Sequence, residues 1–243
     1  MTAKQEARRR TGRRELRLPA VMKLSECAIR FLLAAVLAGT EIFGGHALFG
    51  VAMVGVAGAG LEGFSTLLGA ALGYLSFRGF LEGLRYIAAA MMIFAVGMAL
   101  CDFNIYRRPW FMPLVSAALN GLVGFVYLSA GGWDGEKAVY FATEVVMTAG
   151  AVYFYRLAFS VWAEKREDAR LTVRQTVGVL VLGCTLLMTL TRVTVGDVLS
   201  VGRVLAAAAV MTAGWKGGVG IGSAAGVAAG LAMDFAAAAP PYY

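Results

Sequence analysis

Residues 63–101 read GFSTLLGAALGYLSFRGFLEGLRYIAAAMMIFAVGMALC, which is two apolar runs joined by a short polar stretch. Each run approaches the roughly 20 residues that an α-helix needs to cross a bilayer. Within the polar stretch, Arg78, Glu82 and Arg85 are spaced by four and three residues. On a continuous helix they would share one face as a ladder of alternating charge. We interpret the segment as two membrane-spanning helices with a neutralised turn between them at the interface, and an ion pathway is the alternative.

The composition extends this interpretation to the whole chain. Of the 243 residues, 59% are hydrophobic and 15% are charged, and the mean hydropathy is +0.71. Soluble domains average roughly 45–50% apolar and about 25% charged residues. A soluble protein could not cover such an apolar surplus, whereas a bilayer accepts apolar side chains on the outside of a helix bundle. The composition therefore argues against an ordinary soluble enzyme and predicts an all-α, polytopic transmembrane bundle.

Charged or turn-rich points divide the chain into nine apolar stretches, each close to the length of a bilayer crossing. The nine expected spans are residues 23–40, 43–61, 63–78, 83–101, 110–130, 138–160, 174–191, 197–214 and 217–237. The second and third have almost no polar break between them except Glu62, so a tightly turned or re-entrant pair is the alternative there. An odd number of spans puts the two chain ends on opposite sides, and the chain then looks unfinished.

A basic arm at residues 1–22 precedes the membrane domain, which we place at residues 23–243. Residues 1–30 carry nine Lys or Arg and three Glu, so +6 of the formal net charge of +7 lies at one end. Cytoplasmic segments of membrane proteins retain Lys and Arg, and a cytoplasmic N-terminus puts 16 of the 22 basic residues on that side. We interpret the arm as a topogenic signal at the bacterial cell membrane, compatible with contact to anionic lipid. Nucleic acid is not an expected partner.

A series of glycines spaced by four residues runs through the last expected span. Four residues advance a helix by about 400°, so on one helix these glycines form a slowly drifting groove that another helix backbone can approach closely. A phosphate-binding loop at residues 217–222 is disfavoured, because no strand precedes it and the Walker Lys-Ser/Thr pair is absent. The series is Gly214, Gly218, Gly222, Gly226 and Gly230, with shorter versions of the pattern at Gly55, Ala59 and Gly63 and at Gly69 and Gly73.

Glu144 is the carboxylate of greatest interest, because it falls about two turns inside the sixth expected span, where ionisable groups are costly. A cation site or proton relay is one interpretation, and pairing with an arginine of another span is the simpler one. His46 is expected in an outside turn as a solvated imidazole. No nucleophile stands beside a base, and Cys27, Cys101 and Cys184 lack metal-binding spacing. The residues therefore predict no catalytic group, metal site or cofactor.

Several motifs, taken in order, resemble the N-terminal membrane region of the stage II sporulation protein E family. The basic arm comes first, and the late glycine-rich segment comes last. The resemblance covers essentially the whole chain and rests on the order of motifs that are individually unspecific. The motifs are EIFG at 41–44, LFGVA at 48–52, LLGAALGY at 67–74, LRY at 84–86, GRVL at 202–205 and GGVGIGSAAGVAAGL at 217–231.

The resemblance implies a ten-span membrane domain followed by a cytoplasmic, metal-dependent serine/threonine phosphatase domain. In such proteins the phosphatase acts on an anti-sigma factor antagonist at the asymmetric division septum, where the membrane region associates with a tubulin-like division protein. The nine spans counted here would need one more to return the chain to the cytoplasm. The phosphatase aspartates that would hold manganese or magnesium have no counterpart in this sequence, so we expect no catalytic activity from it.

The expected function is a membrane anchor that self-associates, as a homo-oligomer, through glycine-lined helix faces. The alternative is a small-solute transporter or substrate-binding membrane component, with Glu144 and the glycine-rich helix forming its site. A third interpretation is a lipid-binding scaffold that acts through the basic arm.

Overall fold

The computed structural model describes residues 23–42, 45–131, 134–163, 172–191, 194–195 and 199–237. The basic arm at residues 1–22 lies outside the described residues. The described part is helical apart from short connections, which confirms the all-α class. After a helix over residues 23–38, the elements are α2 (Leu48–Ala57), α3 (Leu61–Leu100), η1 (Asn104–Arg107), α4 (Phe111–Gly131), α5 (Gly135–Ala163), α6 (Val173–Leu190), β1 (Thr194–Val195), β2 (Leu199–Ser200) and α7 (Val201–Ala237).

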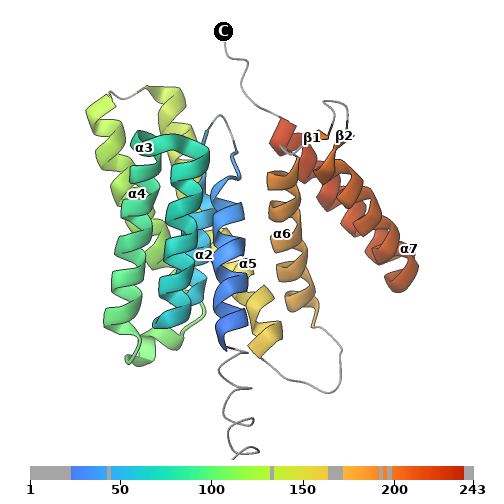
Figure 1. Cartoon of the computed structure of the whole chain (residues 1–243), viewed down its shortest axis with the longest axis horizontal. Helices are drawn as coiled ribbons and strands as arrows, with labels where there is room; N and C mark the ends of the chain where they lie inside the picture. Colours follow the sequence, from blue (N-terminus) through green and yellow to red (C-terminus); the bar gives the residue numbers. More distant parts are fainter. Residues whose placement is uncertain are drawn as a thin grey trace, which may run out of the picture.

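Within the described ranges, five helices are long and apolar enough to cross a membrane, namely α3, α4, α5, α6 and α7. The ends of α4, α5 and α6 lie within three residues of the spans expected from the sequence. The bundle is centred on α2, which packs against α3, α4 and α5, while α6 packs on α5 and α7 lies beside α6 at one edge (Figure 1). The two-residue strands β1 and β2 pair antiparallel between α6 and α7, an element the sequence pattern does not predict.

The 40 residues of α3 form a helical hairpin. Gly79 has φ 73° and ψ −174°, a conformation that is essentially restricted to glycine, so the chain reverses there. The rings of Tyr74 and Tyr86 stack across the two arms at 5.1 Å, and those of Phe64 and Phe94 approach to 6.4 Å. The arms, residues 61–78 and 80–100, correspond to the two helices expected from the opening segment.

This reversal corrects the expected charge ladder. Arg78 lies at the end of the first arm, whereas Glu82 and Arg85 lie on the second arm, so the three side chains do not share one continuous helical face. The four- and three-residue spacing is interrupted because Gly79 leaves the helical conformation. Arg78 still pairs with Glu82 at 3.3 Å, but Arg85 pairs with Glu144 instead.

The 37 residues of α7 form a second hairpin, and this corrects the expected glycine groove. Gly218 has φ 76° and ψ −179° and separates an arm over residues 201–217 from an arm over residues 219–237. The series therefore divides between two arms instead of lining one helix. Gly214 and Gly222 face each other, and a Cβ on Gly222 would lie 2.7 Å from the Gly214 Cα. The close backbone approach that the spacing predicts occurs here, but within the hairpin.

The expected span at residues 43–61 is wrong as a full crossing. Its helix, α2, has only ten residues, about 15 Å at 1.5 Å per residue, and nine of the ten are buried. The sequence is apolar on every side because protein, not lipid, surrounds this helix. Gly58 and Gly60, at φ 78° and 93°, then turn the chain directly into α3, as the tightly turned alternative expects.

Small residues on α3 let another helix backbone approach closely, as the shorter pattern at Gly69 and Gly73 predicts, whereas the pattern at Gly55, Ala59 and Gly63 is wrong because a turn separates α2 from α3. Gly69 lies against the backbone carbonyl of Phe31, and Gly73 lies against that of Ala35, so neither position has room for a Cβ. Both contacts join α3 to the helix over residues 23–38. Because lipid provides no hydrophobic drive between helices, such backbone packing is a main source of stability in a membrane bundle.

We predict that Gly69→Ala destabilises the bundle by about 1–3 kcal/mol, the usual range for overpacking, because its Cβ would clash with the Phe31 carbonyl. The measurement is thermal unfolding of the purified protein in mild detergent. Gly150→Ala is the matched control, because Gly150 is helical and has open space around it. A Gly69→Ala protein that melts with the Gly150→Ala protein would contradict this packing.

Candidate functional site

A hydrogen-bonded cluster surrounds Glu144 in the interior of the bundle. Glu144 lies on α5, nine residues after Gly135 and so about 13 Å along the helix, and is 2% exposed. Its carboxylate accepts from Arg85 Nη2 at 2.6 Å, from His46 Nδ1 at 2.7 Å and from Asn120 Nδ2 at 3.2 Å. An ionised carboxylate can only accept, so Nδ1 of the imidazole carries the shared proton. The three hydrogen bonds offset the free-energy cost of burying the charged carboxylate.

The simpler interpretation of Glu144 therefore matches the geometry, since its arginine partner comes from another helix. Asn120 also donates to Thr148 Oγ1 at 3.2 Å, and Thr148 Oγ1 donates to the Glu144 carbonyl at 2.7 Å. Deeper in the bundle, Ser116 Oγ and Asn120 Oδ1 are buried without a hydrogen-bond partner. Polar groups thus continue from Glu144 along the contact between α4 and α5.

His46 is a member of the cluster that the sequence pattern does not predict. It was expected as a solvated imidazole, but its side chain is 20% exposed and bonds to Glu144. A short bridge positions it, because the backbone groups of Ile42 and His46 exchange hydrogen bonds at 3.0 Å. The segment before α2 is thereby folded so that the ring points at α5. No local signal in the sequence marks this contact, because the two residues are 98 positions apart.

Two tyrosines of α3 hold the start of α2 next to this cluster. The Tyr74 hydroxyl donates to the Ala47 carbonyl at 2.6 Å and accepts from the Val51 amide at 2.9 Å, so it bridges the first turn of the helix. Gly50 permits this approach, since a Cβ there would lie 2.7 Å from the hydroxyl. The Tyr86 hydroxyl accepts from the Ala47 amide at 3.1 Å. The Tyr86 bond thus satisfies the Ala47 amide, which has no partner within the helix, and the Tyr74 hydroxyl reinforces the first turn.

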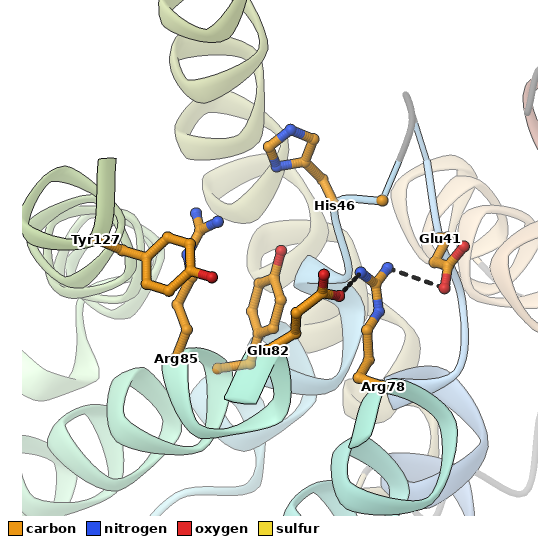
Figure 2. Close-up of a pocket in the computed structure, with 8 residues that line it drawn as sticks. Glu41, His46, Arg78, Glu82, Arg85 and Tyr127 are labelled. Carbon is orange, nitrogen blue, oxygen red and sulfur yellow. Dashed lines mark hydrogen bonds and ion pairs between the residues drawn. The ribbon is translucent and has the colours of Figure 1, made fainter. Parts of the chain in front are cut away.

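A polar cavity of about 210 Å³ opens beside the cluster. Arg78 lies 3.1 Å from a Glu41 oxygen and 3.3 Å from a Glu82 oxygen, and these pairs stand on one side of the cavity (Figure 2). Arg85 and Tyr127 stand on the other side, with His46 above. The lining residues are Glu41, Gly45, His46, Arg78, Glu82, Arg85, Tyr86 and Tyr127.

The structure thus brings four of the expected site residues to one end of the bundle, while the glycine series is elsewhere. Arg78, Glu82 and Arg85 line the cavity, and Arg85 links it to Glu144. The glycines of α7 lie beyond α6, at the edge of the bundle (Figure 1). Glu144 and the glycine-rich helix therefore do not form one site.

Among the described residues, no group of three or more His, Cys, Asp or Glu side chains could hold a metal ion. The three cysteines lie within the described ranges and are free thiols. In this part of the chain the arrangement of charged groups can fix helices in register and bind small polar molecules.

Fold and site together define an all-helical protein with helices suited to a membrane and a buried ion network open to a polar cavity. No protein-family model matches the chain, and no curated protein or solved structure matches it either.

We predict that Glu144→Gln destabilises the protein by about 3–5 kcal/mol, because it leaves the Arg85 guanidinium buried without its counter-charge. Thermal unfolding in detergent measures the effect. Asp134→Asn, at an exposed position just before α5, is the control and should melt like the unmodified protein. Equal melting of Glu144→Gln and Asp134→Asn would show that the network contributes nothing to stability.

Proposed function

We propose that this chain is a polytopic membrane-anchoring and self-association module, of the kind found at the N-terminus of stage II sporulation protein E. The observation that carries the proposal is the division of α3 and α7 into hairpins. It gives two antiparallel helical arms where one continuous helix of 40 residues would measure about 60 Å, twice the hydrocarbon thickness of a bilayer. Each arm instead has a length suited to a single crossing.

Helix lengths support a multi-pass arrangement. The arms of α3 measure about 27 and 31 Å and those of α7 about 26 and 28 Å, at 1.5 Å per residue. With α4, α5, α6 and the helix over residues 23–38, eight helical segments come close to bilayer length. The remaining helix, α2, is shorter and is enclosed by the others.

The distribution of basic residues supports a cytoplasmic N-terminus. One end of the bundle carries Lys23, the Arg30–Glu62 pair at 2.9 Å and the contact of Arg156 with the Arg108 carbonyl at 3.4 Å. The opposite end carries the polar cavity, where both arginines are paired with carboxylates. Basic residues favour the cytoplasmic side, and the first end also carries Arg107 and Arg108 just before α4, so the cavity faces away from the cytoplasm in this proposal.

We expect copies of the chain to associate through α7. This hairpin lies at the edge of the bundle, with Trp215 87% and Val219 89% exposed. A Cβ at Gly220 or Gly230 would meet no neighbouring residue within 4 Å. A second copy can therefore bring its backbone close to these two glycines. Association at the division septum, beside a tubulin-like protein, is the cellular role that the resemblance adds to this proposal.

A solute transporter with its site at Glu144 is less well supported. The Glu144 carboxylate already accepts hydrogen bonds from three side chains, so it has little capacity left for a cargo. It is also separated by α6 from the glycine-rich hairpin that would complete that site. An anchor uses the same network to hold its helices in place.

The topology is tested by cysteine labelling in intact cells, in a background where Cys27, Cys101 and Cys184 are replaced by Ala. A cysteine at Asp134 should react with a membrane-impermeant maleimide, and one at Arg108 should react only after permeabilisation. The two positions lie at opposite ends of the bundle, before α5 and before α4. Labelling of both, or of Arg108→Cys alone, in intact cells would refute the orientation.

Self-association is tested separately by energy transfer between differently labelled copies in proteoliposomes. Gly230→Leu should lower the associated fraction by about tenfold, since a large side chain keeps two backbones apart. Gly183→Leu is the matched control, because Gly183 on α6 is also a helical glycine with open space around it. Equal transfer in the two variants would exclude the α7 interface.

A further inference from the structure

The cavity at the end of the bundle has a chemistry that membrane anchoring does not require. Its wall combines charged, imidazole and phenol groups drawn from the segment before α2, from α3 and from α4. The volume of about 210 Å³ equals roughly seven water molecules at about 30 Å³ each. A compact solute of several heavy atoms fits this space.

The two sides of the cavity differ in charge. On one side the carboxylates of Glu41 and Glu82 flank Arg78, so this side is net negative. On the other side Arg85 and His46 share the single carboxylate of Glu144, and Arg85 keeps guanidinium N–H groups beyond the one bonded to Glu144, so the donors on this side come from Arg85. Figure 2 shows the separation, with Arg85 and Tyr127 across the cavity from Arg78 and Glu41.

Tyr86 holds the two guanidinium groups apart. The Arg78 Cζ lies 5.9 Å and the Arg85 Cζ 5.0 Å from the centre of the Tyr86 ring, and Arg85 also lies 5.5 Å from the Tyr127 ring. The Arg78 side chain is only 5% exposed. Because ion pairs and aromatic rings already fix these side chains, little conformational entropy remains to be lost when a ligand binds.

A lone ion matches this wall poorly. The two arginines and two glutamates that line the cavity cancel, and the buried Glu144 behind Arg85 adds one negative charge, so the site as a whole does not attract an anion. An anion would meet Glu41 and Glu82, and a cation would meet Arg85. A molecule that carries both charges can place each against its opposite.

We propose that the cavity binds a small zwitterion of the α-amino acid class, with its ammonium group at Glu41 and Glu82 and its carboxylate at Arg85. Arg85 also holds Glu144, so the bound carboxylate acts on the group that fixes α3 against α5. The membrane module thereby becomes a receptor for a solute. The binding step itself is independent of the membrane orientation proposed above.

The test is isothermal titration calorimetry of the purified full chain in detergent, with L-alanine, propionate and ethylamine as probes. Propionate and ethylamine are alanine without its amino group and without its carboxylate. We expect alanine to bind at least about tenfold more tightly than either half, a difference of about 1.4 kcal/mol. Absence of alanine binding up to about 10 mM, or equal binding of either half, would overturn the proposal.

Glu82→Gln ties the binding to this cavity. The Glu82 side chain is 62% exposed, so its replacement should leave the melting temperature unchanged while weakening alanine binding about fivefold or more. Asp134→Asn, an exposed carboxylate outside the cavity, should bind alanine like the unmodified protein. Equal affinity in the two variants would mean that alanine binds elsewhere.

A lipid headgroup with phosphate and ammonium groups shares this chemistry, and phosphoethanolamine distinguishes the two sources. Tighter binding of alanine than of phosphoethanolamine identifies a free solute as the ligand. Tighter binding of phosphoethanolamine than of alanine, weakened to the same extent by Glu82→Gln, identifies a lipid headgroup as the ligand. That result would overturn the proposal of an amino acid.

Discussion

The Glu144 carboxylate forms hydrogen bonds to three chain segments whose relative positions apolar packing alone would not fix. Its donors come from the segment before α2, from the second arm of α3 and from α4. Between helices in lipid no hydrophobic drive selects one register, because the tails are as apolar as the side chains. A buried charge with three donors in fixed directions does select one, since any shift leaves it unpaired.

The small residues of α3 act together with this network. Gly69 and Gly73 bring the α3 backbone against the helix over residues 23–38, and that helix leads into the segment that carries His46. Tyr74, one residue beyond Gly73, bridges the first turn of α2. The close helix contact at Gly69 and Gly73 thus places the Tyr74 hydroxyl at the start of α2. The backbone contact and the Tyr74 hydrogen bonds therefore depend on each other.

Much of the helical layout could be predicted from the sequence, because apolar runs and polar breaks report directly on helix length. The two apolar runs on either side of the Arg78–Arg85 stretch form the arms of α3, as predicted. Gly69 and Gly73 lie at a close helix contact, also as predicted. The burial of α2 could not be predicted, since a run of apolar residues looks the same whether lipid or protein covers it. The hydrogen bond between His46 and Glu144 could not be predicted either, because the two residues are far apart in sequence and only the fold brings them together. The four-residue glycine spacing does not produce one helix face in α7, because Gly218 forms a turn within the series.

The enclosure of α2 bears on the order in which the chain enters the bilayer. A ten-residue helix with nine buried residues has no face for lipid, and it is too short to remain across a membrane alone. The hydroxyls that satisfy its first turn belong to Tyr74 and Tyr86, which are synthesised after it. In the membrane arrangement proposed above, segment 48–57 therefore reaches its final surroundings only after both arms of α3 have been synthesised, and the first hundred residues assemble as one unit.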